Sequence, residues 1–258
     1  AMADILTGGR VIFGIGRGYH TREVETFDAP MLDADANREL FEEQFEVISK
    51  AFNQESFSHR GKHYTLPPEV PYRGYQLKEL TLVPRPVHLP VETWQPIVSG
   101  TPRGLDFMAK HGIKGIILGT GEQYIDNWVH QYQEANARHG RDLQLGENLA
   151  LGLWCYVDDT REKARRAMEP IFEEHVKFAA PLGMLRYSDE QMKATGPGGA
   201  ARHIAAGTNF QEVLEKRAWF CGDPEETIGY LKEIEGKYPG LEQILIAFPM
   251  GASRSQFN

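Results

Sequence analysis

The sequence has few cysteines and no close grouping of metal-binding side chains. Only two cysteines, Cys155 and Cys221, stand among 258 residues. Two isolated thiols form neither a disulfide framework nor a metal site, so both are expected to be buried core residues. The closest histidine pair, His59 and His63, falls in an expected turn, whereas a zinc site needs three or four convergent ligands. We therefore predict no metal.

Long hydrophobic runs and an excess of positive charge are also absent. No apolar stretch approaches the ~20 residues that span a bilayer, and residues 1–6 lack the charged and apolar regions of a signal peptide. Acidic residues outnumber basic ones by 36 to 28, which argues against a surface for nucleic acid or anionic membrane. These absences predict a soluble cytoplasmic protein without nucleic-acid or membrane partners.

A dinucleotide-binding fingerprint is missing as well. That fingerprint needs a glycine-rich turn that opens directly into a helix, followed by a strand that ends in an acid about twenty residues on. Here polar residues and Ala29-Pro30 come first, and only then a long amphipathic helix predicted from Asn37 to Phe52. The sequence therefore disfavours a Rossmann nucleotide site.

The chain does have a glycine-rich opening, residues 9–20, in which a short apolar strand runs into a turn. Gly14, Gly16 and Gly18 let the backbone approach a ligand closely, and the guanidinium of Arg17 can take two phosphate oxygens at once. This segment is a candidate anion site. The alternative is a plain strand-to-loop junction with a solvated arginine.

A second candidate anion site follows a short strand at residues 96–98. Thr101 is a good N-cap and Pro102 suits the first helical position, so the backbone N–H groups of residues 99–103 should point outward at a positive helix end. An ordinary capped helix is the alternative reading. The helix dipole contributes only about 0.3–1 kcal/mol, so several donors and an arginine would have to act together.

Strands and helices alternate along the chain, which predicts an α/β fold with a parallel sheet. Residues 56–95 form a proline-rich excursion with too many apolar groups for a disordered segment, and the polar, glycine-rich residues 187–209 predict a mobile loop. We expect a single domain over residues 1–258. Five strands are predicted, at residues 11–15, 96–98, 115–118, 149–157 and 241–248, and the last is expected to be buried. One predicted helix has an apolar face through Tyr124, Trp128, Tyr132 and Ala135. Another is capped at residues 158–160 and carries Ala164, Met168, Ile171, His175 and Phe178, with His175 expected to be a packed helix residue.

The opening segment, with Glu23-Val24-Glu25-Thr26-Phe27 and the acidic helix after it, resembles the bacterial luciferase-like monooxygenase family. The resemblance continues in the family's order over essentially the whole chain, through residues 57–64, 84–87, 97–102 and 222–226. It implies an α/β fold of the TIM (β/α)8 barrel type. Because such a barrel has eight strands, the chain is expected to lack the first three βα units and the last helix.

The resemblance also implies a cofactor, FMN or in one branch a deazaflavin, at the carboxyl ends of the strands. Luciferases carry an acid at the position of Gly100, so backbone N–H groups are the expected substitute here. His20 is a weak candidate for a catalytic residue, and no base is assigned. The cofactor-binding residues implied are Arg17, Gly18, Tyr19, Ser99, Gly100 and Thr101.

Three functions stay open at this point. The first is a flavin-dependent monooxygenase that uses reduced FMN and O2 to oxygenate a small organic substrate, with a flavin reductase as partner, a homo-oligomeric state, and loop 187–209 closing over the site to exclude water. The second is hydride transfer with a deazaflavin, which needs no oxygen. The third is a flavin-binding protein without turnover.

Overall fold

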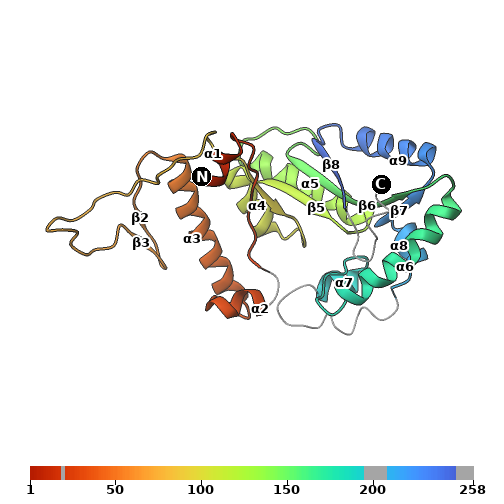
Figure 1. The fold of residues 1–258 in the computed structure, drawn as a ribbon, viewed down its shortest axis with the longest axis horizontal. Helices are drawn as coiled ribbons and strands as arrows, with labels where there is room; N and C mark the ends of the chain where they lie inside the picture. Colours follow the sequence, from red (N-terminus) through yellow and green to blue (C-terminus); the bar gives the residue numbers. More distant parts are fainter. Residues whose placement is uncertain (19–20, 195–207, 248–258) are drawn as a thin grey trace. The chain divides into compact units, whose positions relative to one another are not determined.

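The computed structural model describes residues 1–18, 21–194 and 208–247 (Figure 1). The chain packs as two units, residues 1–94 and 95–258. Within the described ranges, no helix combines the length and the apolar character that a bilayer crossing requires. The first unit contains α1 (Met2–Leu6), β1 (Phe13–Gly14), α2 (Thr21–Val24), a 3-10 turn (Glu25–Phe27), α3 (Ala34–Asn53), β2 (His59–Arg60), β3 (Thr65–Leu66) and the start of β4 (Thr93–Pro96).

The long helix α3 organises the first unit. It begins earlier than predicted because Asp33 caps it, accepting hydrogen bonds from the N–H groups of Asp35 and Ala36. Near its end the ring of Phe52 meets the ring of Phe13 edge-on, with centroids 5.2 Å apart. Phe13 starts β1, which pairs in parallel with the first residues of β4 and is shorter than the predicted strand at 11–15.

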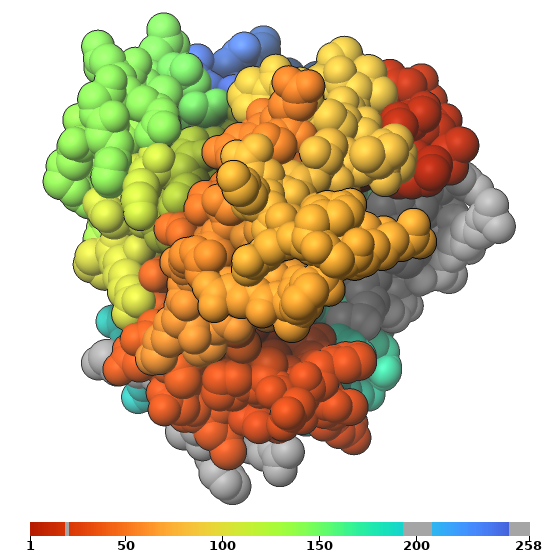
Figure 2. Space-filling model, turned by 90° about the vertical axis from the view of Figure 1, so that its left-hand side faces the viewer, coloured from red at the N-terminus to blue at the C-terminus, as the bar shows by residue number. Residues whose placement is uncertain are grey.

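The excursion after α3 is tied back to that helix, and Figure 2 shows it in amber over the orange of α3. The Glu43 carboxylate accepts hydrogen bonds from the backbone N–H groups of His63 and Tyr64 and from Nε2 of His59. Burial alone would raise the pKa of Glu43, but these donors outweigh it and hold the pKa below its usual value. Nδ1 of His59 lies 3.2 Å from the Lys50 ammonium, so both ring nitrogens contact protein side chains.

The second unit is built on parallel strands with helices between them. The elements after β4 are α4 (Pro102–His111), β5 (Lys114–Leu118), α5 (Glu122–Arg138), β6 (Leu149–Val157), α6 (Arg161–Ala179), α7 (Asp189–Ala194), α8 (Phe210–Glu215), β7 (Trp219–Gly222), α9 (Pro224–Lys237) and β8 (Gln243–Ile246). Part of the predicted mobile loop is therefore α7. Residues 195–207 lie outside the described residues, and the loop's mobility stays a prediction.

The long strand β6 is the centre of this unit and has the bounds that its apolar run predicts. Ala150 pairs with Ile116 of β5 and with Gln243 of β8, while Trp154 pairs with Trp219 of β7, all in parallel. Figure 1 shows α6 and α8 on one side of β7 and α9 on the other. The predicted α/β class with a parallel sheet is confirmed.

Three expectations about strands need correction. The strand predicted at 96–98 is β4, which begins three residues earlier and ends two residues earlier. The last strand was expected to be buried, but Leu245 and Ile246 of β8 are 41% and 51% exposed. Strand β7 was not predicted. It has only four residues before the N-cap of α9, which is too few to show the alternation of apolar and polar residues that marks a strand.

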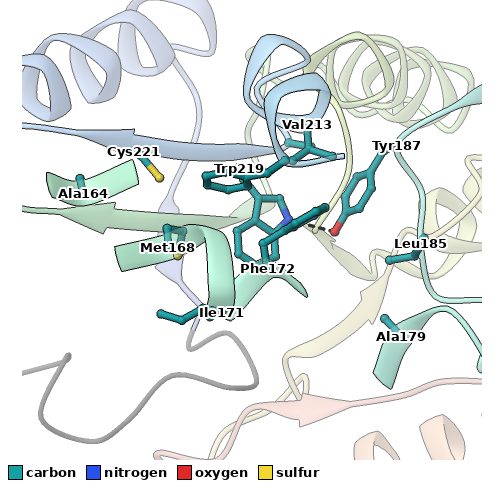
Figure 3. Close-up of a cluster of buried hydrophobic side chains, with 12 residues drawn as sticks. Ala164, Met168, Ile171, Phe172, Ala179, Leu185, Tyr187, Val213, Trp219 and Cys221 are labelled. Atoms are coloured by element: carbon teal, nitrogen blue, oxygen red, sulfur yellow. Dashed lines mark hydrogen bonds between the residues drawn. The ribbon is translucent and has the colours of Figure 1, made fainter. Parts of the chain in front are cut away.

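Both cysteines are free and buried, as predicted. Burial raises the pKa of Cys155 to about 11 and that of Cys221 to about 12, so both thiols stay protonated at neutral pH. Cys221 belongs to an apolar cluster between α6, α8 and β7 (Figure 3). Its members are Ala164, Met168, Ile171, Phe172, Ala179, Leu185, Tyr187, Phe210, Val213, Ala218, Trp219 and Cys221.

Candidate cofactor-binding site

The first candidate anion site is the glycine-rich loop after β1. A Cβ atom built on Gly14 or Gly16 would meet no atom of the described chain within 4 Å, so the backbone there is open to an approaching ligand. Gly18 differs, because its φ is +76° and a Cβ atom would lie 2.4 Å from Cγ2 of Val24. Of the three glycines, Gly18 is thus the one whose place in the loop excludes a side chain.

Arg17, the charged residue of this loop, is half-buried and held by α3. Its Nη1 donates a hydrogen bond to Oδ1 of Asn37 at 2.9 Å. Asn37 lies in the first turn of α3 and is only 6% exposed. The guanidinium is therefore attached to a helix and not only to its own loop. Tyr19 and His20 lie outside the described residues, and their suggested roles stay predictions.

The second candidate anion site is the loop from Ser99 to Thr101, which leads into α4. Gly100 has a φ of +56°, and a Cβ atom on it would lie 2.2 Å from Cδ1 of Trp128. Trp128 comes from α5 and is 3% exposed, so its indole ring cannot move away easily. No acidic side chain can stand at position 100 in this backbone, so at this position only the backbone N–H can donate to a ligand.

Thr101 occupies the N-cap position of α4, as predicted, but its hydroxyl does not cap the helix. Side-chain oxygens of the N-cap residues Asp33, Thr160, Asn209 and Asp223 accept hydrogen bonds from the first turns of their own helices. Pro102 follows Thr101 at the first position of α4. The amino end of α4 thus keeps donors that its own cap does not take, and such ends bind anions.

The predicted site residues are divided between the two units. Arg17 and Gly18 lie in the first unit, whereas Ser99, Gly100 and Thr101 lie in the second. That they hold one phosphate together stays a prediction.

Two helix residues that lie against these loops were not found as site residues from the sequence. Trp128 was predicted only as part of the apolar face of its helix, and Asn37 only as a helix residue. A glycine that must adopt a positive φ implies a close neighbour, but the sequence does not say which one. The contact between Arg17 and Asn37 joins residues twenty positions apart and leaves no periodic pattern.

We expect Gly100→Ala to lower the free energy of unfolding by about 2 kcal/mol. About 1 kcal/mol comes from the left-handed backbone, and the rest from pressing a methyl group against the Trp128 indole. Urea unfolding of the variant measures the change. Gly140→Ala is the matched control, because Gly140 has a φ of +74° but no atom within 4 Å of its Cβ position in the described chain. Equal losses for the two variants would show that Trp128 does not restrict the loop.

Parallel strands with helices between them, and candidate anion loops directly after two of the strands, define an enzyme-like β/α barrel architecture. The family model of the luciferase-like monooxygenases matches residues 1–238, and the chain belongs to this family. A sequence search of curated proteins finds no match.

Solved structures similar to the chain include monooxygenases and a coenzyme F420-dependent reductase. The chain is 18% identical to the monooxygenase RslO1 from Streptomyces bottropensis, with a TM-score of 0.67, over 99% of this chain and 67% of that one. The chain is 15% identical to the oxygenating constituent of the Pseudomonas putida 3,6-diketocamphane monooxygenase in complex with FMN, with a TM-score of 0.66. The match covers 95% of this chain and 66% of that one. The chain is 16% identical to the coenzyme F420-dependent tetrahydromethanopterin reductase from Methanopyrus kandleri, with a TM-score of 0.59. The match covers 99% of this chain and 73% of that one.

These likenesses confirm the predicted luciferase-like barrel fold. The chain spans about two thirds of the length of the first two structures. The similar structures include an FMN-bound monooxygenase and an F420-dependent reductase. The likeness by itself does not extend to substrate or mechanism.

Proposed function

We propose that this protein is a flavin-dependent monooxygenase that uses reduced FMN and O2 to oxygenate a small organic substrate. The observation that carries the proposal is the uncapped amino end of α4, where the Thr101 hydroxyl does not cap and Gly100 is pressed against Trp128. Such an end attracts a phosphate through its backbone N–H groups and its positive dipole. Membership of the family makes the phosphate of FMN the fitting occupant.

The residues present fit the phosphate group of this cofactor. In the proposed arrangement the Arg17 guanidinium binds two oxygens of the phosphate, and Gly18 lets the backbone approach it. Residues 99–101 supply N–H donors. When bound, FMN supplies the redox chemistry with O2. The protein binds and orients the cofactor, positions the substrate and excludes water. A flavin reductase is the expected source of reduced FMN.

Arg17→Ala is expected to weaken FMN binding by about 1.5–3 kcal/mol, the range of a hydrogen bond to a charged group. Riboflavin lacks the phosphate and should lose much less affinity. Isothermal titration calorimetry with both ligands measures the two effects. Arg60→Ala is the control, because it removes the same charge from an exposed position where the guanidinium pairs with Glu69. Equal losses for FMN and riboflavin would refute the phosphate site.

A second candidate is a deazaflavin-dependent oxidoreductase, favoured by the likeness to the F420-dependent reductase. The two candidates differ in their need for oxygen. Oxygen consumption with reduced FMN and a set of small organic substrates supports the monooxygenase. Substrate-dependent anaerobic reduction of F420, with no oxygen consumption in the first assay, would replace the proposal by this second function.

A further inference from the structure

The contact between Arg17 and Asn37 joins the glycine-rich loop to α3, the longest described helix of the first unit. Arg17 stands between Gly16 and Gly18, which restrict the backbone least of all residues. An arginine in such a loop keeps many conformations unless something outside the loop fixes it. The 2.9 Å hydrogen bond from its Nη1 to Oδ1 of Asn37 provides that fixed point.

Asn37 is itself held firmly. The side chain of Asp33 caps the first turn of α3, and the backbone N–H of Asn37 donates to the carbonyl oxygen of Asp33 at 2.9 Å. The residue is 6% exposed, so its amide is confined by packing as well as by the helix. The acceptor offered to Arg17 therefore has a defined position.

The chemistry of the acceptor matters as much as its position. An amide oxygen takes one of the five N–H donors of a guanidinium and adds no negative charge. A carboxylate at the same place would compensate the positive charge and compete with an incoming anion. An asparagine oxygen therefore orients the guanidinium without placing a negative charge beside it.

We propose that Asn37 is a positioning residue that orients Arg17 for the cofactor phosphate without neutralising it. The inference rests on the proposed function, since it gives Arg17 the phosphate as its ligand. It extends that function to a residue that does not itself belong to either anion-binding loop. Asn37 acts only through Arg17, which makes the two residues energetically coupled in phosphate binding.

Two variants test this inference by equilibrium binding of FMN and riboflavin. Asn37→Leu removes the acceptor, and we expect FMN affinity to fall about tenfold while riboflavin affinity changes little. Asn37→Asp keeps an acceptor but adds a charge, and we expect FMN affinity to fall at least as much, with a smaller loss at high salt because the added charge is screened. In the Arg17→Ala background, Asn37→Leu should have no further effect on FMN affinity.

Asn53→Leu is the matched control, because Asn53 lies on the same helix and its Oδ1 accepts a hydrogen bond from the backbone N–H of Val91. It should lower stability without changing the ratio of FMN to riboflavin affinity. If Arg17→Ala selectively weakens FMN and Asn37→Leu does not, the inference about Asn37 fails while the proposed function stands. If Arg17→Ala does not discriminate between the ligands, or if the unaltered protein binds no FMN, the proposed function fails and the inference falls with it.

Discussion

Trp219→Ala is expected to lower the free energy of unfolding by about 3–5 kcal/mol, the range for removing a fully buried large side chain. Trp219 is the first residue of β7 and is 1% exposed. Its indole ring meets the ring of Phe172 edge-on, with centroids 5.1 Å apart (Figure 3), and stacks on the ring of Trp154 at 5.4 Å. Alanine would leave a cavity that β7, paired along its length with β6, cannot close.

The same residue also makes a buried hydrogen bond. Its Nε1 donates to the hydroxyl of Tyr187 at 2.9 Å, and Tyr187 is 2% exposed. Tyr187→Phe would remove the acceptor but keep the ring, so it should cost about 1–3 kcal/mol by leaving a buried N–H without a partner. The loss for Trp219→Ala should exceed that for Tyr187→Phe, because it adds the cavity to the lost bond.

Urea unfolding followed by circular dichroism measures both losses. Phe178→Ala is the control, since Phe178 is an aromatic residue of the same unit that is 47% exposed. It should change the free energy of unfolding by about 1 kcal/mol or less. A cost for Trp219→Ala no larger than that for Phe178→Ala would mean that this cluster is not the core of the second unit.

The sequence allowed parts of this core to be predicted and not others. Helix α6 shows its apolar positions over several turns and its start at Thr160, so its bounds and the packing of His175 follow from periodicity. Phe178 lies on the predicted apolar face but is exposed. Periodicity shows which side of a helix is apolar, but it does not show at which turn the neighbouring elements stop covering that side. Trp219 lies in a strand too short to show any period.

The candidate site divides in the same way. Glycine spacing and a cap followed by proline are local signals, so the loops around Arg17 and Gly100 could be predicted from neighbouring residues alone. The Thr101 hydroxyl fails to cap because of its conformation, which the residue type does not determine. The partners Asn37 and Trp128 come from distant elements, and only the folded chain brings them to these loops.

We expect the buried His175 to make this unit less stable in acid. His175 is 7% exposed, and its ring lies 4.9 Å from that of Trp154 and 5.2 Å from that of Trp219. Its Nδ1 and the Nε1 of Trp154 are buried without a hydrogen-bond partner among the described residues. Because burial penalises the charged imidazolium, the pKa of His175 is lowered from 6.5 to about 4.

The free energy of unfolding should therefore fall as the pH drops from 6.5 towards 4, by about 3 kcal/mol at the lower end from this group alone. The sign follows from proton binding. Over this interval the imidazole takes up a proton in the unfolded chain but stays neutral in the folded one, so lowering the pH favours unfolding. Urea unfolding between pH 7 and pH 5 measures most of the effect before most carboxylates titrate.

His175→Phe keeps an aromatic ring in the cluster and removes the titrating group. Its free energy of unfolding relative to the unaltered protein should rise by about 2 kcal/mol between pH 7 and pH 5. His130→Phe, a substitution at an exposed histidine of the same unit, should leave the pH dependence parallel to that of the unaltered protein. If the free energies of unfolding of His175→Phe and of the unaltered protein differ by the same amount across this pH range, the folded unit accepts the proton on His175. Water would then reach an imidazole ring that the packing encloses.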